Sequence, residues 1–274
     1  MTLPKRDAIA LATVSVLAAM LLPVWSMPAI AQVAHLPPAG AQYDSQLGGA
    51  YPPPPGTRIV SRDREAPPAP GLYNICYVNA FQTQPQDSDW WIANHPDLLL
   101  QRLGNWVEDA NWTGEILLDT SSAAKRAGLL AIVNSWIDGC ADAGYDAIEA
   151  DNLDTYSRSG GALAIADNLA FAVELVAHAH AQGLAFGQKN SGELVDRGQA
   201  IGFDFAIVES CEVYSECNGF TQVFGAHVLE IEYTDTDAAF FHASCAERGD
   251  MISIVRRDRN LTAPGDASYV YESC

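Results

Sequence analysis

The sequence AAKRAGLLAIVNSWIDGCADAGYDAIEAD, residues 123–151, contains the repeating unit from which the fold can be inferred. Residues 123–143 form a long helical stretch, and Gly144 follows it in the position of a C-terminal helix cap. Residues 146–151 then form a short β-rich run. The same order returns at 164–188, where an alanine-rich helical stretch (164–182), Gly183 and a second β-rich run (184–188) follow one another. Strands that alternate with helices in this way predict a parallel sheet.

Short β-rich runs recur along the chain and are numerous enough to close a barrel. We therefore predict a single-domain (β/α)8 TIM-type barrel, which needs roughly 250 residues of the 274 present. A doubly wound open sheet is the alternative, but no glycine-rich phosphate loop follows any of the runs. The candidate strands are 43–47, 57–62, 72–80, 115–119, 146–151, 184–188, 204–209, 227–232 and 251–255.

Residues 1–31 have the features of a secretory signal peptide. Lys5 and Arg6 precede an apolar run at 8–22, and a small-x-small motif that ends at Ala31 offers a cleavage site. We therefore expect a secreted protein, cleaved near Ala31, that makes no membrane contact after cleavage. An uncleaved membrane anchor is the alternative, although the apolar run is slightly short for a span.

Residues 32–71 form a proline-rich segment that differs in composition from the rest of the chain. The segment holds nine of the fifteen prolines, which alone would be typical of a linker. The runs 43–47 and 57–62 within it could still supply early barrel strands. The catalytic barrel domain is expected over 72–274.

The charge of the chain is strongly acidic, with 15 basic and 34 acidic residues and a formal net charge of −19. Such a surface repels nucleic acids and anionic membranes. It favours a cationic partner, and a cationic polymer is the natural candidate; a role in solubility alone is the alternative. We expect a monomer that requires no cofactor.

Six cysteines follow the N-terminal segment, an even number that predicts three disulfides in an exported chain. Six cysteines allow 15 connectivities. Two of them are close enough in sequence to close a small loop, and the last one could attach the C-terminus to a late helix. Zinc is the alternative, but no CxxC motif or matching histidine pair supports it, so we expect no metal. The expected pairs are Cys76–Cys140, Cys211–Cys217 and Cys245–Cys274.

Polar residues end several candidate strands, and in a parallel barrel these ends form the active site. With a period of two, Glu149 and Asp151 share one face of their strand, and Glu230 and Glu232 share one face of theirs. An acid that faced the helices would be a costly unpaired charge, so we expect all four at the barrel mouth, where crowding raises some pKa values. A protonated acid beside an ionised one suits glycoside hydrolysis. The other polar strand-end residues are Tyr77, Asn79, Asp119, Asn152, Lys189, Asn190, Glu209 and Tyr233.

Several of these neighbours have expected roles of their own. Lys189 is expected to neutralise the acids rather than to catalyse, and Asn152 and Asn190 can hydrogen-bond to sugar hydroxyls. Trp90 and Trp91 lie in an expected loop after a strand, where they could stack on sugar rings. The remaining tryptophans of the helical region are expected to pack in the core: Trp106, Trp112 and Trp136.

Seven short segments, in order between residues 73 and 233, carry a family resemblance. They are ICYVN (75–79), GEILLD (114–119), GYDAIEADN (144–152), AHAQGLAFGQKN (179–190), FDFAIVESC (203–211), YSEC (214–217) and VLEIEY (228–233). Together they resemble glycoside hydrolase family 114, the endo-α-1,4-polygalactosaminidases. The resemblance implies a TIM-type barrel that cleaves within chains of α-1,4-linked galactosamine, a cationic polymer when it is partly deacetylated.

The resemblance also implies roles for individual residues. Asp151 would be the nucleophile and Glu209 the general acid/base, with retention of configuration at the anomeric carbon. The Cys211–Cys217 disulfide would hold the loop beside Glu209. The residues that would bind substrate are Tyr77, Asn79, Asp119, Glu149, Asn152, Lys189, Asn190, Glu232 and Tyr233.

Two other functions remain open at this point. A non-catalytic glycan-binding barrel would keep the groove without turnover, although the presence of both Asp151 and Glu209 favours an enzyme. A metal-dependent hydrolase could use the same acids, and a chelator would then abolish its activity.

Overall fold

The computed structural model describes Met1 and residues 34–274, and the latter form a nearly closed parallel barrel. Eight strands run parallel to their neighbours, and a ninth pairs antiparallel with the last of them. The predicted TIM-type fold is thus confirmed, whereas the predicted signal peptide at 1–31, with its cleavage near Ala31, lies outside the described residues. In order of pairing, the strands are β1 (Tyr43–Ser45), β2 (Ile59–Asp63), β3 (Tyr73–Asn79), β6 (Ala147–Asp151), β7 (Ala185–Lys189), β8 (Phe205–Glu209), β9 (Val228–Tyr233), β10 (Ser253–Arg257) and β11 (Tyr271–Ser273).

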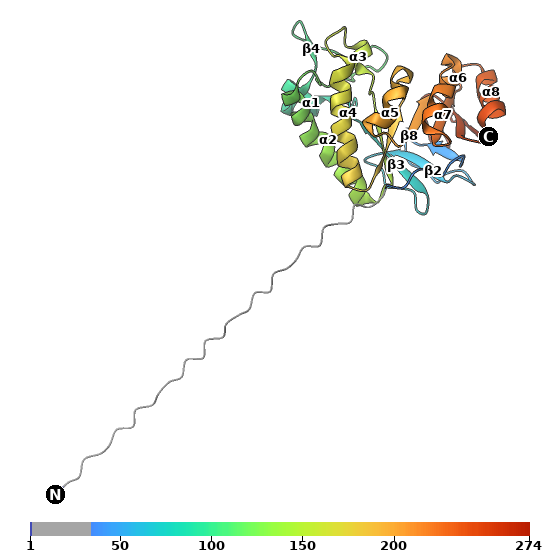
Figure 1. Ribbon diagram of the computed structural model, residues 1–274, viewed down its shortest axis with the longest axis horizontal. Coiled ribbons are helices and arrows are strands. Elements are labelled where there is room, and N and C mark those ends of the chain that lie inside the picture. Colours follow the sequence, from blue (N-terminus) through green and yellow to red (C-terminus); the bar gives the residue numbers. More distant parts are fainter. Residues whose placement is uncertain (2–33) are drawn as a thin grey trace. The chain divides into compact units, whose positions relative to one another are not determined.

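The proline-rich segment supplies β1 and β2, the first two strands of the sheet. No helix separates β1, β2 and β3, so this side of the barrel is covered by loops (Figure 1). The seam between β1 and β10 is bridged by side chains. The fully buried Arg257 donates hydrogen bonds to Asp44 Oδ1, at 2.6 Å, and to the carbonyl of Ser45. The Tyr271 hydroxyl donates to the carbonyl of Tyr43 at 3.0 Å.

The candidate strand at 115–119 is wrong as a barrel strand, because these residues lie outside the main sheet. β3 pairs directly with β6, and Tyr77 stands opposite Glu149. Residues 116–118 instead form isolated bridges within the long connection between β3 and the helix at 123–143. Ile116, Leu117 and Leu118 are buried, and a short apolar run buried on all sides has the sequence appearance of an internal strand.

Helices cover the rest of the barrel, and Figure 1 shows α2 and α4 side by side on one flank. Both helices match their predicted ranges within one residue. Ser122 caps the first turn of α2 by accepting a hydrogen bond from the Lys125 N–H, and Gly144 ends the helix with a φ of 88° that favours glycine. The helices are α1 (Ser88–Asn94), η1 (Pro96–Leu98), α2 (Ala123–Ala143), α3 (Thr155–Arg158), α4 (Ile165–Ala181), η2 (Gly192–Arg197), α5 (Gly198–Ile201), α6 (Cys211–Tyr214), α7 (Cys217–Phe224) and α8 (Ala238–Arg248), and β4 (Gln101–Arg102) and β5 (Asn105–Trp106) form a small hairpin.

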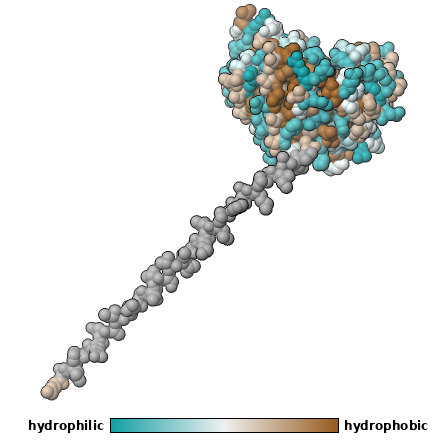
Figure 2. All heavy atoms as spheres, viewed as in Figure 1, coloured by the Kyte–Doolittle hydropathy of each residue, from teal (hydrophilic) through white to brown (hydrophobic). Residues whose placement is uncertain are grey.

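Two apolar layers define which way each strand residue points. One layer lies inside the barrel and includes Ile75, Ala147 and Leu229. The other lies between the strands and the helices and includes Ile148 and Val228. Because successive residues of a strand alternate between these layers, the direction of every polar strand-end side chain follows from its apolar neighbours. The face in Figure 2 is mostly hydrophilic, with apolar residues gathered near its centre.

Three disulfides join the elements in the pairs expected from the sequence. Cys76–Cys140 connects β3 to α2, Cys211–Cys217 connects the first residues of α6 and α7, and Cys245–Cys274 connects α8 to the C-terminal residue. Among the helices of the described residues, none has both the length and the apolar character needed to cross a membrane.

Candidate active site

A cavity of about 430 Å³ opens at the C-terminal ends of the parallel strands. This is the end of a parallel barrel at which active sites are built. Seven of the eleven predicted site residues line the cavity: Tyr77, Asp151, Asn152, Lys189, Asn190, Glu209 and Tyr233.

Lys189, at the end of β7, is the central cation of the cavity floor. Its buried Nζ lies 2.7 Å from Glu149 Oε1, 3.7 Å from Asp151 Oδ1 and 3.6 Å from Glu209 Oε2. Burial alone would lower the pKa of Lys189, but the three carboxylates outweigh it and raise that pKa well above its usual value. Lys189 is therefore a permanent positive charge, as its predicted neutralising role requires.

Glu149 lies directly beneath the cavity and faces the barrel interior, as the period of two predicted. It is fully buried, and the Ser61 hydroxyl donates a hydrogen bond to its second oxygen. Burial raises the pKa of Glu149, although Lys189 and Ser61 oppose that rise. Glu149 thus forms an ion pair with Lys189 beneath the cavity and is not itself part of the cavity lining.

Asp151 ends β6 and points into the cavity with both oxygens held. The Tyr77 hydroxyl donates to Oδ2 at 2.9 Å, and the Asn152 N–H donates to Oδ1 at 2.9 Å. Asn152 has a left-handed φ of 67°, a conformation that asparagine tolerates better than most residues. Its side chain donates to Asn79 Oδ1 at 2.8 Å, which places Asn79 just behind the cavity wall.

Glu209 ends β8 and is held in a similar way. The Tyr233 hydroxyl donates to Oε1, the Asn190 side-chain amide donates to Oε2 at 2.8 Å, and the Glu209 N–H donates back to Asn190 Oδ1. Burial opposes ionisation of Glu209, but the charge of Lys189 and the hydrogen bonds from Tyr233 and Asn190 prevail and lower its pKa. Glu209 is therefore ionised in the free protein at neutral pH.

The spacing of these two carboxyl groups is limited by their shared cation. Asp151 Oδ1 and Glu209 Oε2 lie 3.7 and 3.6 Å from the same Lys189 Nζ. The two oxygens therefore lie within roughly 7 Å of each other, a limit that includes the 5–5.5 Å spacing of retaining glycosidases and only the low end of the inverting range.

Two predicted site residues lie elsewhere. Asp119 ends the misassigned segment 115–119, and its carboxylate binds the Ser121 hydroxyl and Lys125 Nζ, the latter at 3.0 Å, outside the cavity lining. Glu232 faces the helices, because it alternates with the interior residue Ile231. Its Oε1 accepts a hydrogen bond from the Glu212 N–H at 3.0 Å.

Glu230 also faces the helices, which contradicts the expectation that both acids of β9 lie at the barrel mouth. It is fully buried, and the nearest cation is Arg248 of α8, whose Nε lies 3.7 Å from Glu230 Oε2. Burial raises the pKa of Glu230 to about 7, and Glu232 adds to the rise. The expectation failed because Arg248 supplies a cation on this face and the raised pKa favours the neutral carboxyl group, so the acid is not an unpaired charge.

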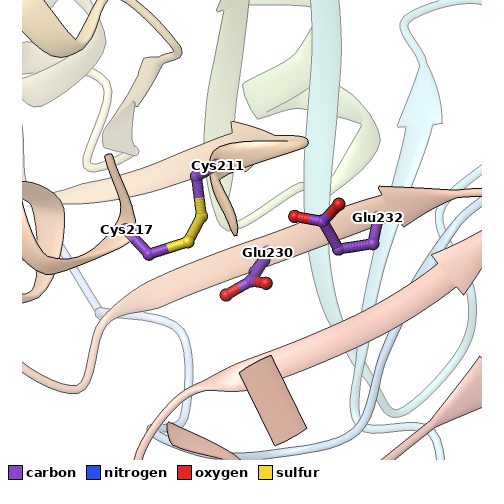
Figure 3. Close-up of side chains that lie close together, drawn as sticks. All are labelled: Cys211, Cys217, Glu230 and Glu232. Carbon is purple, nitrogen blue, oxygen red and sulfur yellow. A yellow bond between two sulfur atoms is a disulfide. The ribbon is translucent and has the colours of Figure 1, made fainter. Parts of the chain in front are cut away.

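Figure 3 shows Glu230 and Glu232 next to the Cys211–Cys217 disulfide. Among the described residues, these four side chains are close enough to resemble a metal site, with ligand atoms within 4.8 Å of one another. The two sulfurs are joined in a disulfide and therefore offer no thiolate, which is the form of cysteine that binds metals. The group lies on the outer face of the barrel wall and contributes nothing to the cavity lining.

The cavity also contains residues that sequence reasoning missed. Trp112, expected in the core, is 49% exposed and lines the cavity, whereas Trp90 is outside the lining and Trp91 is buried. The period of two could have identified Asp63, which ends β2 on the interior face. Arg158 ends the one-turn helix α3, and the other charged residues lie in loops whose approach no periodicity predicts: Asp109, Glu115, Asp154 and Arg259.

Comparisons with known proteins agree with this geometry. The family profile described as Glycoside-hydrolase family GH114 matches residues 25–274. No curated protein sequence matches the chain.

Solved structures with similar folds include three proteins from a fungus and two bacteria. Ega3 of Aspergillus fumigatus, solved in complex with galactosamine, is 23% identical, with 89% of this chain and 99% of that chain covered and a TM-score of 0.69. The glycoside hydrolase domain of PelA from Pseudomonas aeruginosa is 13% identical, with coverages of 82% and 98% and a TM-score of 0.59. The maltogenic α-amylase AmyB of Thermotoga neapolitana is 10% identical, with coverages of 84% and 70% and a TM-score of 0.50.

Proposed function

The chain belongs to glycoside-hydrolase family GH114 and is a glycoside hydrolase, and from this premise we propose that it is a secreted, retaining endo-enzyme that cleaves α-1,4-linked galactosamine polymers. The observation that carries the proposal is the pair Asp151 and Glu209. Both carboxylates face one cavity, each is held by a tyrosine hydroxyl, and both lie next to Lys189.

We propose that Asp151 is the nucleophile. Its oxygen attacks the anomeric carbon as the glycosidic bond breaks, and Glu209 gives its proton to the departing oxygen. In the second step Glu209 takes a proton from water, and the water oxygen displaces Asp151 with a second inversion. Tyr77 and Tyr233 hold the two carboxylates in place during these steps.

The substrate proposal rests on charge. Ega3 was solved in complex with galactosamine, and a polymer of that sugar carries ammonium groups unless it is acetylated. The net charge of −19 and the carboxylates of the cavity suit such a cationic chain. Secretion is supported by the three disulfides, which persist in oxidising compartments.

Turnover of an α-1,4-galactosamine polymer tests the activity, with oligosaccharide products followed by mass spectrometry. Asp151→Asn and Glu209→Gln should each lower kcat by roughly 10²- to 10⁴-fold, because each removes a group that acts on the reacting atoms. Asp119→Asn is the matched control, since that carboxylate lies outside the cavity, and it should retain near-normal turnover. A wild-type protein that binds the polymer and releases no products would favour the non-catalytic barrel.

Rescue by azide tests which carboxylate has which role. On an oligomer with a nitrophenyl leaving group, Glu209→Ala should recover turnover with azide and yield an α-glycosyl azide, because azide then attacks the Asp151-linked intermediate. Asp151→Ala should instead yield the β-glycosyl azide by direct displacement. The opposite pair of products would reverse the two roles.

A further inference from the structure

The acidic residues that line the cavity fall into groups according to their cationic partners. Lys189 lies next to the catalytic pair. Arg158 pairs with Asp109 at 2.6 Å and with Asp154 at 2.7 Å. Two further carboxylates of the lining, Asp63 and Glu115, form no ion pair with any of the described residues.

Glu115 is a buried carboxylate with one oxygen left open. It is 9% exposed, and its Oε2 accepts hydrogen bonds from the side-chain amides of Asn79, at 3.2 Å, and Gln82, at 2.5 Å. No group among residues 34–274 donates a hydrogen bond to its Oε1, although Glu115 lines the cavity. Burial raises the pKa of Glu115, and the charges of Asp151 and Asp109 add to the rise. A cation at Oε1 would relieve each of these costs.

Asp63 ends β2, next to the strand that carries Tyr77. The Glu65 N–H donates to its Oδ1 at 2.9 Å, and the Gln84 side-chain amide donates to its Oδ2 at 2.8 Å. These donors are neutral, so the negative charge of Asp63 reaches the cavity uncompensated. Glu115 lies close to the catalytic carboxylate, since Asn79 contacts both Glu115 and the residue that follows Asp151.

We propose that Asp63 and Glu115 each offer a carboxylate to the ammonium groups of galactosamine units in the cavity, and so make the enzyme select free-amine units over N-acetylated ones. This inference rests on the proposed function. An ammonium group has three donors and a full charge, whereas an acetamide has one N–H and no charge. An acetylated unit beside either carboxylate would leave it desolvated without a cation. Loss of a hydrogen bond to a charged group corresponds to roughly 10- to 100-fold in affinity.

The test measures kcat/KM for a galactosamine oligomer and for the N-acetylgalactosamine oligomer of the same length. Asp63→Asn and Glu115→Gln keep size and hydrogen-bonding capacity while removing charge. Each should lower kcat/KM for the free-amine oligomer by roughly tenfold and leave that for the acetylated oligomer unchanged or higher. Glu108→Gln is the matched control, an exposed glutamate of the same loop outside the cavity lining, and it should change neither value.

Binding of the two oligomers, measured by calorimetry in an Asp151→Asn background, separates this inference from the proposed function. A free-amine preference that Asp63→Asn or Glu115→Gln abolishes supports the inference even where the wild-type protein cleaves neither oligomer. Equal losses for both oligomers, or an amine preference that survives both substitutions, would overturn it. Thermal unfolding confirms that each variant is folded before it is compared.

Discussion

At the residue scale, the site is organised by one buried cation. Lys189 of β7 lies beside Glu149, Asp151 and Glu209, so the two strands that flank β7 present their acids to a single ammonium group. Without that cation, the negative charge crowded into this low-dielectric site would have no compensating partner. A tyrosine hydroxyl donates to each of the two proposed catalytic carboxylates, and the residue after each of β6, β7 and β8 has a left-handed φ.

The pH profile follows from the lowered pKa of Glu209. In the proposed mechanism the protonated form of Glu209 is the active one, so kcat/KM should fall as pH rises through that pKa, and the optimum should be acidic. Lys189→Met removes the charge that lowers this pKa, so the falling limb should move to higher pH, whatever happens to the maximal rate. Lys125→Met, outside the cavity, should leave the limb in place. A rate that instead rises with pH through this region would mean that ionised Glu209 is the nucleophile.

The direction of a strand side chain could be predicted only where the sequence showed which face of the strand lies inside the barrel. The inward direction of Glu149 and Asp151 was predicted correctly, since Ala147 shares their face and packs inside the barrel. The same period of two placed Glu230 and Glu232 on one face but could not say which, and a burial argument that ignored protonation chose wrongly. Trp112 was missed because its exposure depends on a loop.

At the scale of elements, the repeats of a helix, a glycine and a strand could be predicted from the sequence, because each part has a local physical signal. Gly144 ends α2 with a positive φ, and the strand that follows, β6, is a short run of mostly buried residues. The structure of the connection between β3 and α2 could not be predicted from the sequence. Its apolar run at 116–118 is buried by long-range contacts and not by pairing in the main sheet. β1 and β2 were visible only as short runs among prolines.

The outer face of β9 gives a prediction about stability. The pKa of Glu230 is raised from 4.5 to about 7 by burial, so its stabilising contribution is complete below about pH 4.5 and is lost as pH rises through 7. The shift corresponds to about 3 kcal/mol of unfolding free energy. Glu230→Gln mimics the protonated form, so the variant should gain stability relative to wild type at pH 8 and change little at pH 4.

Denaturant unfolding at both pH values, with the disulfides intact, measures the effect. Glu247→Gln is the control, because that exposed glutamate pairs with the same Arg248 at 2.9 Å. If Glu230→Gln and Glu247→Gln showed the same pH dependence as wild type, Glu230 would not be the titrating group.

At the scale of the whole molecule, the net charge of −19 can act on a cationic substrate in two ways: by long-range attraction to the surface and by direct contact in the cavity. Asp63 and Glu115 act within the cavity, over hydrogen-bonding distance, where salt screens little. The remaining acidic surface acts over the Debye length, which is about 10 Å at 0.1 M ionic strength and about 3 Å at 1 M. The two contributions therefore differ in their response to salt.

If the surface charge attracts the cationic polymer, kcat/KM for long galactosamine chains should fall steeply between low and high ionic strength, roughly tenfold or more, mainly through association. Short free-amine oligomers that fill only the cavity should lose much less, and fully N-acetylated chains should be indifferent to salt because they carry no charge. Initial rates at fixed pH across a salt series measure all three. Equal salt dependence for long and acetylated chains would leave the acidic surface a determinant of solubility alone, and substrate choice would then rest on the cavity carboxylates.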